Sequence, residues 1–273
     1  MMRLTAVLLV SMTLPLAGQW LSYPDARTPR TQDGKPDLGA PAPRQHGKPD
    51  LSGLWQDERT PLSELTNALG ATAAQLQVDL SDLTKHAINV FWGLKPAEEP
   101  LRPEARAIMK QRAHVDSPAS RCLPSGVPAD TFIYPNKWIM TPQETVILSG
   151  SGDPPRQIYT DGRSLPKDPD PTWTGYSVGR WEGDTLVVDT TGFNERAWLD
   201  LMGHPRSESM HILERYRRRD FGHMDLEVTI DDPKYYTRPF TFRTVLNLVP
   251  DSDVLEYVCN EDEKDVVHTA ATQ

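Results

Sequence analysis

The residues of this chain that could carry out chemistry gather in one polar stretch. Asp200, His204, His211 and Glu214 bring two imidazoles and two carboxylates close together in the sequence. A histidine titrates near neutral pH and can exchange a proton with a bound molecule, and a neighbouring carboxylate would orient its ring. The four residues therefore predict acid–base catalysis on a small organic molecule, of the lyase, isomerase or hydrolase type.

Four further residues are predicted to contact the ligand. Trp173 and Tyr176 follow a proline-rich loop, where aromatic rings can stack on an apolar molecule. Tyr216 and Arg218 share an alternating strand pattern with Glu214, on a face whose mixed polarity is typical of a polar pocket. Tyr176 or Arg218 would also stabilise a negative charge that develops on an oxygen during the reaction.

A divalent metal ion is a second way to use these histidines. Imidazoles and a carboxylate suit zinc or a similar ion, with ligand distances of about 2.0–2.2 Å. The spacing matches no established zinc motif such as HExxH, and His211 and Glu214 would face opposite sides of a strand. We therefore assign no metal ligand and no cofactor, and a divalent metal is the less favoured hypothesis. A third possibility is that both histidines only hydrogen-bond loop carbonyls.

The charge of the chain argues against nucleic acid as a partner. The 273 residues carry a formal net charge of −9, and removal of Arg3 with the N-terminal segment makes it 28 − 38 = −10. Arg217, Arg218 and Arg219 are consecutive, so in a strand they point to two faces and form no single basic patch. A small-molecule ligand is the expected partner, and the oligomeric state is left open.

The first residues have the pattern of a secretory signal peptide. One arginine precedes an apolar run, and Ala17 and Gly18 are small enough for cleavage. We assign residues 1–18 to the signal peptide and expect no stable membrane anchor, because the run is too short to span a bilayer. An uncleaved anchor helix is the alternative. The expected location is the periplasm or the outside of the cell.

The cysteines fit that location. In an oxidising compartment, Cys122 and Cys259 would most simply form one disulfide that closes a long loop. Two free buried thiols are the alternative.

The rest of the chain divides into an arm and one domain. Residues 19–48 are rich in Pro, Gly, Lys and Asp, and predict an extended arm that is partly disordered or lies along the domain surface. A single domain covers residues 49–268. It includes a helical insertion at about 62–115, within which Pro103–His114 has the clearest helix signals.

Short apolar stretches separated by turn residues predict the strands of this domain. Successive strands joined by short turns, with no helices between them, favour an antiparallel meander. So many strands in one domain tend to close into a barrel, because open edges promote aggregation. We therefore expect a mainly β fold with one to three helices in its N-terminal part. The predicted strands are 54–56, 132–140, 145–149, 156–160, 176–181, 186–190, 210–218, 224–230, 240–248 and 254–259.

Several phrases of the sequence carry a family resemblance. Gly53-Leu54-Trp55 resembles the Gly-x-Trp opening of lipocalin-like, or calycin, barrels. Longer phrases resemble an uncharacterised family of secreted bacterial proteins, over roughly residues 47–265. The resemblance implies secretion and a β-rich, lipocalin-like barrel, and it transfers no catalytic residues. The phrases are PDLSGLW, RCLP, GYSVGRWEGDTLVV, GHP, ERY, TIDDP and EYVCNE.

Two functions of different classes follow from these observations. The first is a secreted or periplasmic barrel enzyme that uses His204, His211 and Glu214. The alternative is a non-catalytic, lipocalin-like binder or carrier of a small apolar ligand. Convergence of the two imidazoles on one cavity would favour the enzyme, whereas a cavity with apolar walls and no such convergence would favour the binder.

Overall fold

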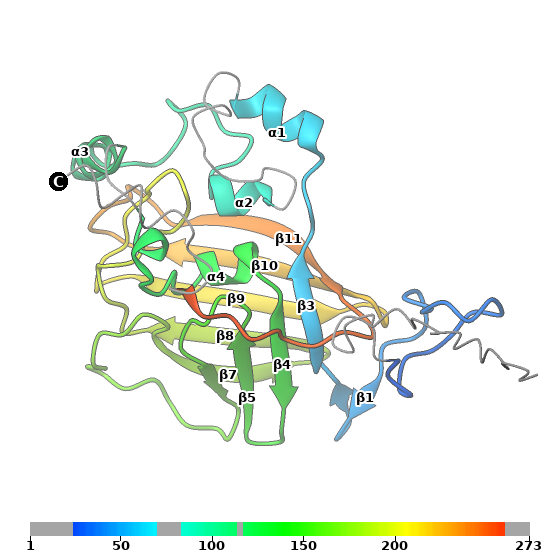
Figure 1. Ribbon diagram of the computed structural model, residues 1–273. Coiled ribbons are helices and arrows are strands. Elements are labelled where there is room, and N and C mark those ends of the chain that lie inside the picture. Colours follow the sequence, from blue (N-terminus) through cyan, green and yellow to red (C-terminus); the bar gives the residue numbers. More distant parts are fainter. Residues whose placement is uncertain (1–23, 70–82, 114–116, 260–273) are drawn as a thin grey trace, which may run out of the picture.

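The chain forms a closed β-barrel. The computed structural model describes residues 24–69, 83–113 and 117–259 (Figure 1). Its barrel strands follow the order β10-β11-β3-β4-β5-β6-β7-β8-β9, and β9 pairs with β10 to complete the ring. The expectation of a mainly β chain that closes into a barrel is confirmed. The barrel strands are β3 (Gly53–Asp57), β4 (Asn136–Met140), β5 (Glu144–Ser149), β6 (Arg156–Tyr159), β7 (Tyr176–Glu182), β8 (Thr185–Thr191), β9 (His211–Arg218), β10 (His223–Asp231) and β11 (Phe240–Leu248).

The order of the strands is a meander with one unexpected pairing. Strands that are neighbours in the sequence are neighbours in the barrel, and β11 pairs with β3 to close it. All of these pairs are antiparallel except β6 and β7, where Ile158 lies opposite Ser177 in a parallel ladder. The long proline-rich segment 160–175 carries the chain back along the barrel, so that β7 runs in the same direction as β6. The barrel is therefore mixed rather than purely antiparallel.

Alternation along the strands decides which side chains enter the barrel. In β9, Ile212, Glu214, Tyr216 and Arg218 are buried, whereas the residues between them are partly or fully exposed. Successive residues of a strand point to opposite faces, so the buried set faces inward. Large rings fill the interior, and the rings of Trp138 and Tyr216 meet edge to face at 4.8 Å.

The helices α1 and α2 lie above β11 in Figure 1, and α4 lies next to the upper end of β4. Four α-helices lie within the described ranges, one more than the sequence led us to expect. None of these helices is long and apolar enough to cross a membrane. The sequence also predicted a strand from residue 132, but β4 begins only at Asn136 because the preceding residues form α4. The helices are α1 (Leu62–Leu69), α2 (Lys85–Ile88), α3 (Pro103–Arg112) and α4 (Ala129–Ile133), with a 3₁₀ turn, η3, at Ala119–Arg121.

The described part of the arm, residues 24–48, lies along the surface and contacts the β9–β10 turn. The two short strands β1 (Arg44–Gln45) and β2 (Lys48–Pro49) lie where the arm joins the domain. The backbone N–H of Gly222, in the β9–β10 turn, donates to the carbonyl of Leu38 at 2.8 Å. A Cβ on Gly222 would lie 2.4 Å from the Cβ of Leu38, so glycine permits this close approach.

The C-terminal strap, residues 249–259, crosses the outer face of β3 and β4 (Figure 1). The prediction of a strand at 254–259 is wrong, because the β3–β11 pairing has already closed the barrel and leaves no edge to join. Lys137 of β4 holds the strap through Asp253 at 2.6 Å. At its end, Cys259 forms a disulfide with Cys122, as expected from the sequence.

Removal of this disulfide should destabilise the protein. The bond joins residues 137 positions apart, and its loss restores conformational freedom to the unfolded chain. The double variant Cys122→Ala/Cys259→Ala should lose about 2–5 kcal/mol of unfolding free energy. Equilibrium unfolding in urea measures the loss, and reduced wild-type protein provides the matched comparison. Identical unfolding midpoints for oxidised wild type and the double variant would contradict this expectation.

Candidate functional site

His204 and Asp200 form a buried pair on the helical side of the barrel. The carboxylate of Asp200 accepts a hydrogen bond from Nδ1 of His204 at 2.6 Å, and both residues are at most 3% exposed. The same carboxylate accepts the backbone N–H groups of His204, at 3.2 Å, and of Val90, at 2.8 Å. These contacts tie the loop before β9 to the segment after α2.

The second ring nitrogen of His204 has no hydrogen-bond partner among the described residues. Nε2 is buried without one, and the ring of Phe91 packs against the imidazole at 5.0 Å in an edge-to-face contact. His204 lines neither of the two cavities described below. In this conformation the pair therefore has no open route for proton exchange with a ligand in those cavities.

His211 lies on the outside of the barrel. It begins β9, its side chain is 40% exposed, and Nε2 pairs with Asp189 of β8. His204, by contrast, is enclosed beneath its loop and pairs with Asp200. The structure does not bring the two imidazoles together.

Glu214 lies inside the barrel, in a third environment. Arg156 of β6 donates to both of its carboxylate oxygens, with 3.0 Å between Nη1 and Oε1. Tyr216 donates its hydroxyl to the same Oε1 at 2.7 Å. Arg156 also donates to Ser177 at 3.2 Å and to Thr190 at 3.0 Å. We call these five side chains the Arg156–Glu214 network.

The network is internally neutralised. Burial lowers the pKa of Arg156, but the charge and hydrogen bonds of Glu214 outweigh this effect and raise its pKa above the usual range. Burial first, and then Glu214, raise the pKa of Tyr216 well above its usual value, so the phenol stays protonated. The hydroxyl of Tyr216, which the sequence predicts to contact a ligand, therefore donates its hydrogen bond to Glu214 instead. A fully paired buried network of this kind is typical of a structural role.

The predicted pair Trp173 and Tyr176 makes separate contacts. The hydroxyl of Tyr176 accepts a hydrogen bond from Arg163 at 3.2 Å, and its ring lies 5.3 Å from that of Tyr159. The indole of Trp173 lies under the guanidinium of Arg196 at 4.7 Å. Each of the two side chains therefore already contacts an arginine, and neither lines the cavities described below.

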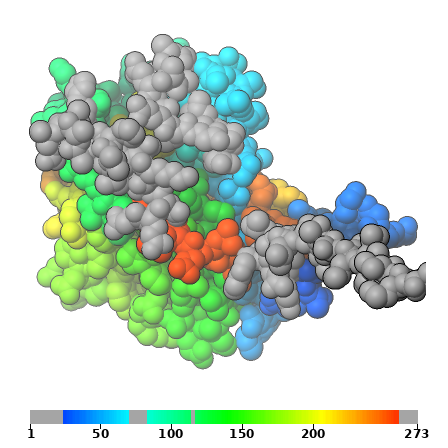
Figure 2. All heavy atoms as spheres, viewed as in Figure 1, coloured from blue at the N-terminus to red at the C-terminus, as the bar shows by residue number. Residues whose placement is uncertain are grey.

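Arg218 is the sequence-predicted residue that does line a cavity. This rim cavity, of about 740 Å³, lies where the arm and the strap meet the barrel at β3 and β4. In the space-filling view the strap, in red, lies directly above the green surface of β4 and β5 (Figure 2). Apolar side chains form much of the wall of the rim cavity. These are Leu54, Trp138, Ile139, Phe221, Leu248 and Val249.

The guanidinium of Arg218 is held by main-chain oxygens and aromatic rings. It donates to the carbonyl of Asp50 at 2.5 Å and to that of Phe221. It also stacks on Trp55 at 4.8 Å and on Phe221 at 5.1 Å. Burial lowers the pKa of Arg218 to about 10, so it remains a cation at neutral pH.

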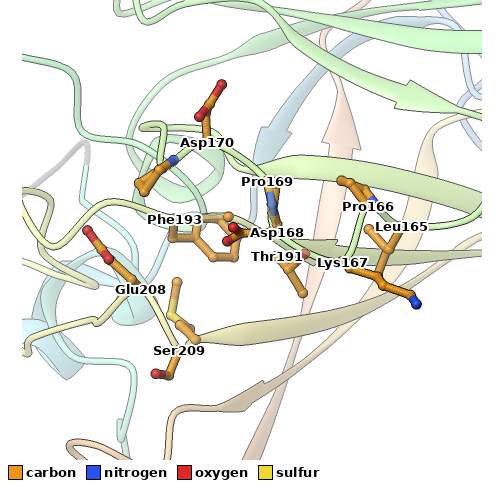
Figure 3. Close-up of a pocket in the computed structure, with 13 residues that line it drawn as sticks. Leu165, Pro166, Lys167, Asp168, Pro169, Asp170, Thr191, Phe193, Glu208 and Ser209 are labelled. Atoms are coloured by element: carbon orange, nitrogen blue, oxygen red, sulfur yellow. The ribbon is translucent and has the colours of Figure 1, made fainter.

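A second cavity, of about 520 Å³, lies beside the proline-rich loop. Figure 3 shows residues 165–170 on one side of it and Glu208 and Ser209 on the other, with Phe193 between them. None of the residues predicted from the sequence as a site lines this cavity.

Sequence reasoning missed several of these residues. Arg156 shares a strand face with the buried Ile158, and that alternation was a usable signal for an inward-facing cation. Residues 175–179 (GYSVG) also have the form of a GxSxG serine elbow. Ser177, however, is fully buried within β7 and bonded to Arg156 and Thr190, not placed at a strand-to-helix turn.

The described residues contain no cluster of side chains suited to bind a metal ion. No group of three or more His, Cys, Asp or Glu side chains there is arranged to hold a metal ion. Asp200, His211 and Glu214 instead occupy three different environments, each with its own partner.

Breaking the Arg156–Glu214 network should be costly. The substitution Glu214→Gln keeps the shape but leaves Arg156 as an uncompensated buried charge, which typically costs about 3–5 kcal/mol. His211→Ala, on the outer face of the same strand, removes an exposed pair and should cost about 0–1 kcal/mol. Urea unfolding of the two variants and wild type measures both values. Equal stability of Glu214→Gln and wild type would show that the network is not structural.

Known proteins provide no further guide to this site. Comparisons with protein-family models, with curated proteins and with solved structures find no match to this chain. The resemblance to secreted bacterial proteins therefore stays an expectation, and the function has to be argued from the geometry of the barrel itself.

Proposed function

We propose that this chain is a binding protein for a small, largely apolar molecule, which it holds in the rim cavity. The observation that carries the proposal is a cavity of about 740 Å³ with apolar walls at one end of a closed barrel. Small-molecule sites commonly have volumes of about 300–1,000 Å³ and occur at the mouths of barrels.

The composition of the cavity wall supports an apolar ligand. Trp138 of β4 and Leu248 of β11 come from inward-facing strand positions, and Leu54 and Ile139 come from outward-facing ones. Burial of apolar ligand surface against such a wall contributes about 25 cal/mol for each Å² removed from water. Val249 of the strap adds to the same wall.

A location outside the cytoplasm is part of the proposal. The disulfide between Cys122 and Cys259 is the kind of bond that persists in an oxidising compartment. Residues 1–18, which lie outside the described ranges, have the pattern of a signal peptide. Both observations support a periplasmic or secreted protein.

The acid–base enzyme hypothesis has less support than the binder. It requires His204, His211 and Glu214 to act on one bound molecule. His204 is enclosed beneath its loop, His211 pairs with Asp189 outside the barrel, and Glu214 is neutralised by Arg156 inside it. The rim cavity, in contrast, already combines apolar walls with polar groups in a space of suitable size.

Filling the rim cavity should weaken ligand binding. Ile139 lines the cavity and is 41% exposed, so Ile139→Trp places a bulky ring there without disturbing the core. The matched control is Leu62→Trp on α1, which is 51% exposed and does not line the cavity. The neutral fluorescent probe N-phenyl-1-naphthylamine should bind wild type and the control equally. Its Kd should rise about tenfold or more in Ile139→Trp, a loss of about 1.4 kcal/mol.

Fluorescence titration of wild type, Ile139→Trp and Leu62→Trp measures whether the probe binds in the rim cavity. Saturable binding that Ile139→Trp removes and Leu62→Trp keeps supports the rim cavity as the binding site. Unchanged binding in Ile139→Trp, or no saturable binding to wild type, would overturn the proposal.

A further inference from the structure

We infer that the rim cavity selects ligands with an anionic group, a carboxylate above all, and that Arg218 is the residue that binds this group. The inference rests on the proposed function, because it names the chemical class of the molecule held in the same cavity. It adds a charge requirement that apolar walls alone would not impose.

The first observation is that Arg218 is a buried cation without a counter-ion. It is 4% exposed, and no carboxylate of the described residues lies within ion-pair distance of its guanidinium. Its hydrogen-bond acceptors among the described residues are main-chain carbonyls, which carry no net charge. Arg156, the buried arginine at the centre of the barrel, has Glu214 as its counter-ion.

The second observation is a spare donor on Arg218. A guanidinium has five N–H groups. Nε donates to the carbonyls of Asp220 and Phe221, and Nη1 donates to those of Asp50 and Ser52. Nη2 donates to Phe221 alone, so one of its two N–H groups has no partner among the described residues. A residue that lines a cavity with an unused donor is suited to bind a ligand acceptor there.

The other charges of the cavity are largely compensated. Four aspartates line the cavity, and three of them pair with a cation. The paired cations reduce the electrostatic repulsion between these aspartates and an anionic ligand. These three pairs are Asp25–Arg27 at 2.7 Å, Asp251–Arg30 at 2.5 Å and Asp253–Lys137 at 2.6 Å.

Asp50 is the fourth aspartate. Its carboxylate accepts the backbone N–H of Ser52 at 2.8 Å and makes no ion pair with Arg218. Asp50 and Asp220 both act to raise the pKa of Arg218, but burial prevails and lowers it to about 10. The positive charge of the guanidinium is therefore not fully compensated, and a ligand carboxylate would supply the counter-charge by accepting the free N–H of Nη2.

Arg218 lies beside the apolar wall. Trp138, Leu248 and Arg218 all come from inward-facing strand positions at the arm end of the barrel. A molecule whose carboxylate meets Arg218 would therefore lay its apolar body against Trp138 and Leu248. The expected ligand class is an amphipathic carboxylic acid.

Two probes of the same shape test the charge requirement. The probes are 2-naphthoate and the neutral 2-naphthamide, titrated by calorimetry into the full chain at neutral pH. Naphthoate should bind wild type about tenfold or more tightly than naphthamide. Arg218→Met should remove this preference and keep naphthamide binding. Arg217→Met, on the same strand but facing outward, should leave the preference intact.

The outcomes separate the inference from the proposed function. Equal affinities of the two probes for wild type, with both lost in Ile139→Trp, would overturn selection by Arg218 and leave the binding function standing. Preference for naphthoate that persists in Arg218→Met would also overturn the role of Arg218. Absence of binding by either probe would overturn both. The comparison on wild type decides the charge requirement even if Arg218→Met does not fold.

Discussion

Strand alternation in a closed barrel is the constraint on which the rest of this structure depends. Every second residue of β9 points into the buried interior of the barrel. The polar groups of Glu214, Tyr216 and Arg218 therefore need hydrogen-bond partners within the protein. Glu214 meets Arg156 and Tyr216 at the centre of the barrel. Arg218, at the end of the strand, meets main-chain carbonyls and two aromatic rings but no carboxylate of the described residues. It is therefore a cation without a counter-ion beside the rim cavity.

The fold was largely predictable because alternation and turn residues act locally. The strands around 176–190 and 210–248 lie close to their predicted positions, and the barrel closes as expected. The parallel β6–β7 pair was not predictable, since it depends on how far the loop 160–175 carries the chain. The strand expected at 254–259 failed for a similar reason, because the available edge is taken by the distant β3.

The candidate site was predicted less well, because sites depend on contacts between remote segments. The spacing of His211 and Glu214 correctly placed them on opposite faces of a strand, but nothing local revealed their partners Asp189 and Arg156. Arg218 was chosen for its strand face, and it does line a cavity. The arm and the strap that complete the cavity lie near opposite ends of the sequence, where no motif connects them.

NMR mapping of bound 2-naphthoate can show whether the rim cavity holds a small molecule. The indole of Trp138 lines the cavity, whereas the indole of Trp92 donates to Glu64 at 3.0 Å on the helical side of the barrel. Naphthoate should shift the indole N–H resonance of Trp138 in a saturable manner and leave that of Trp92 unchanged. A response confined to Trp92, to the loop around His204 or to the cavity beside the proline-rich loop would contradict this expectation.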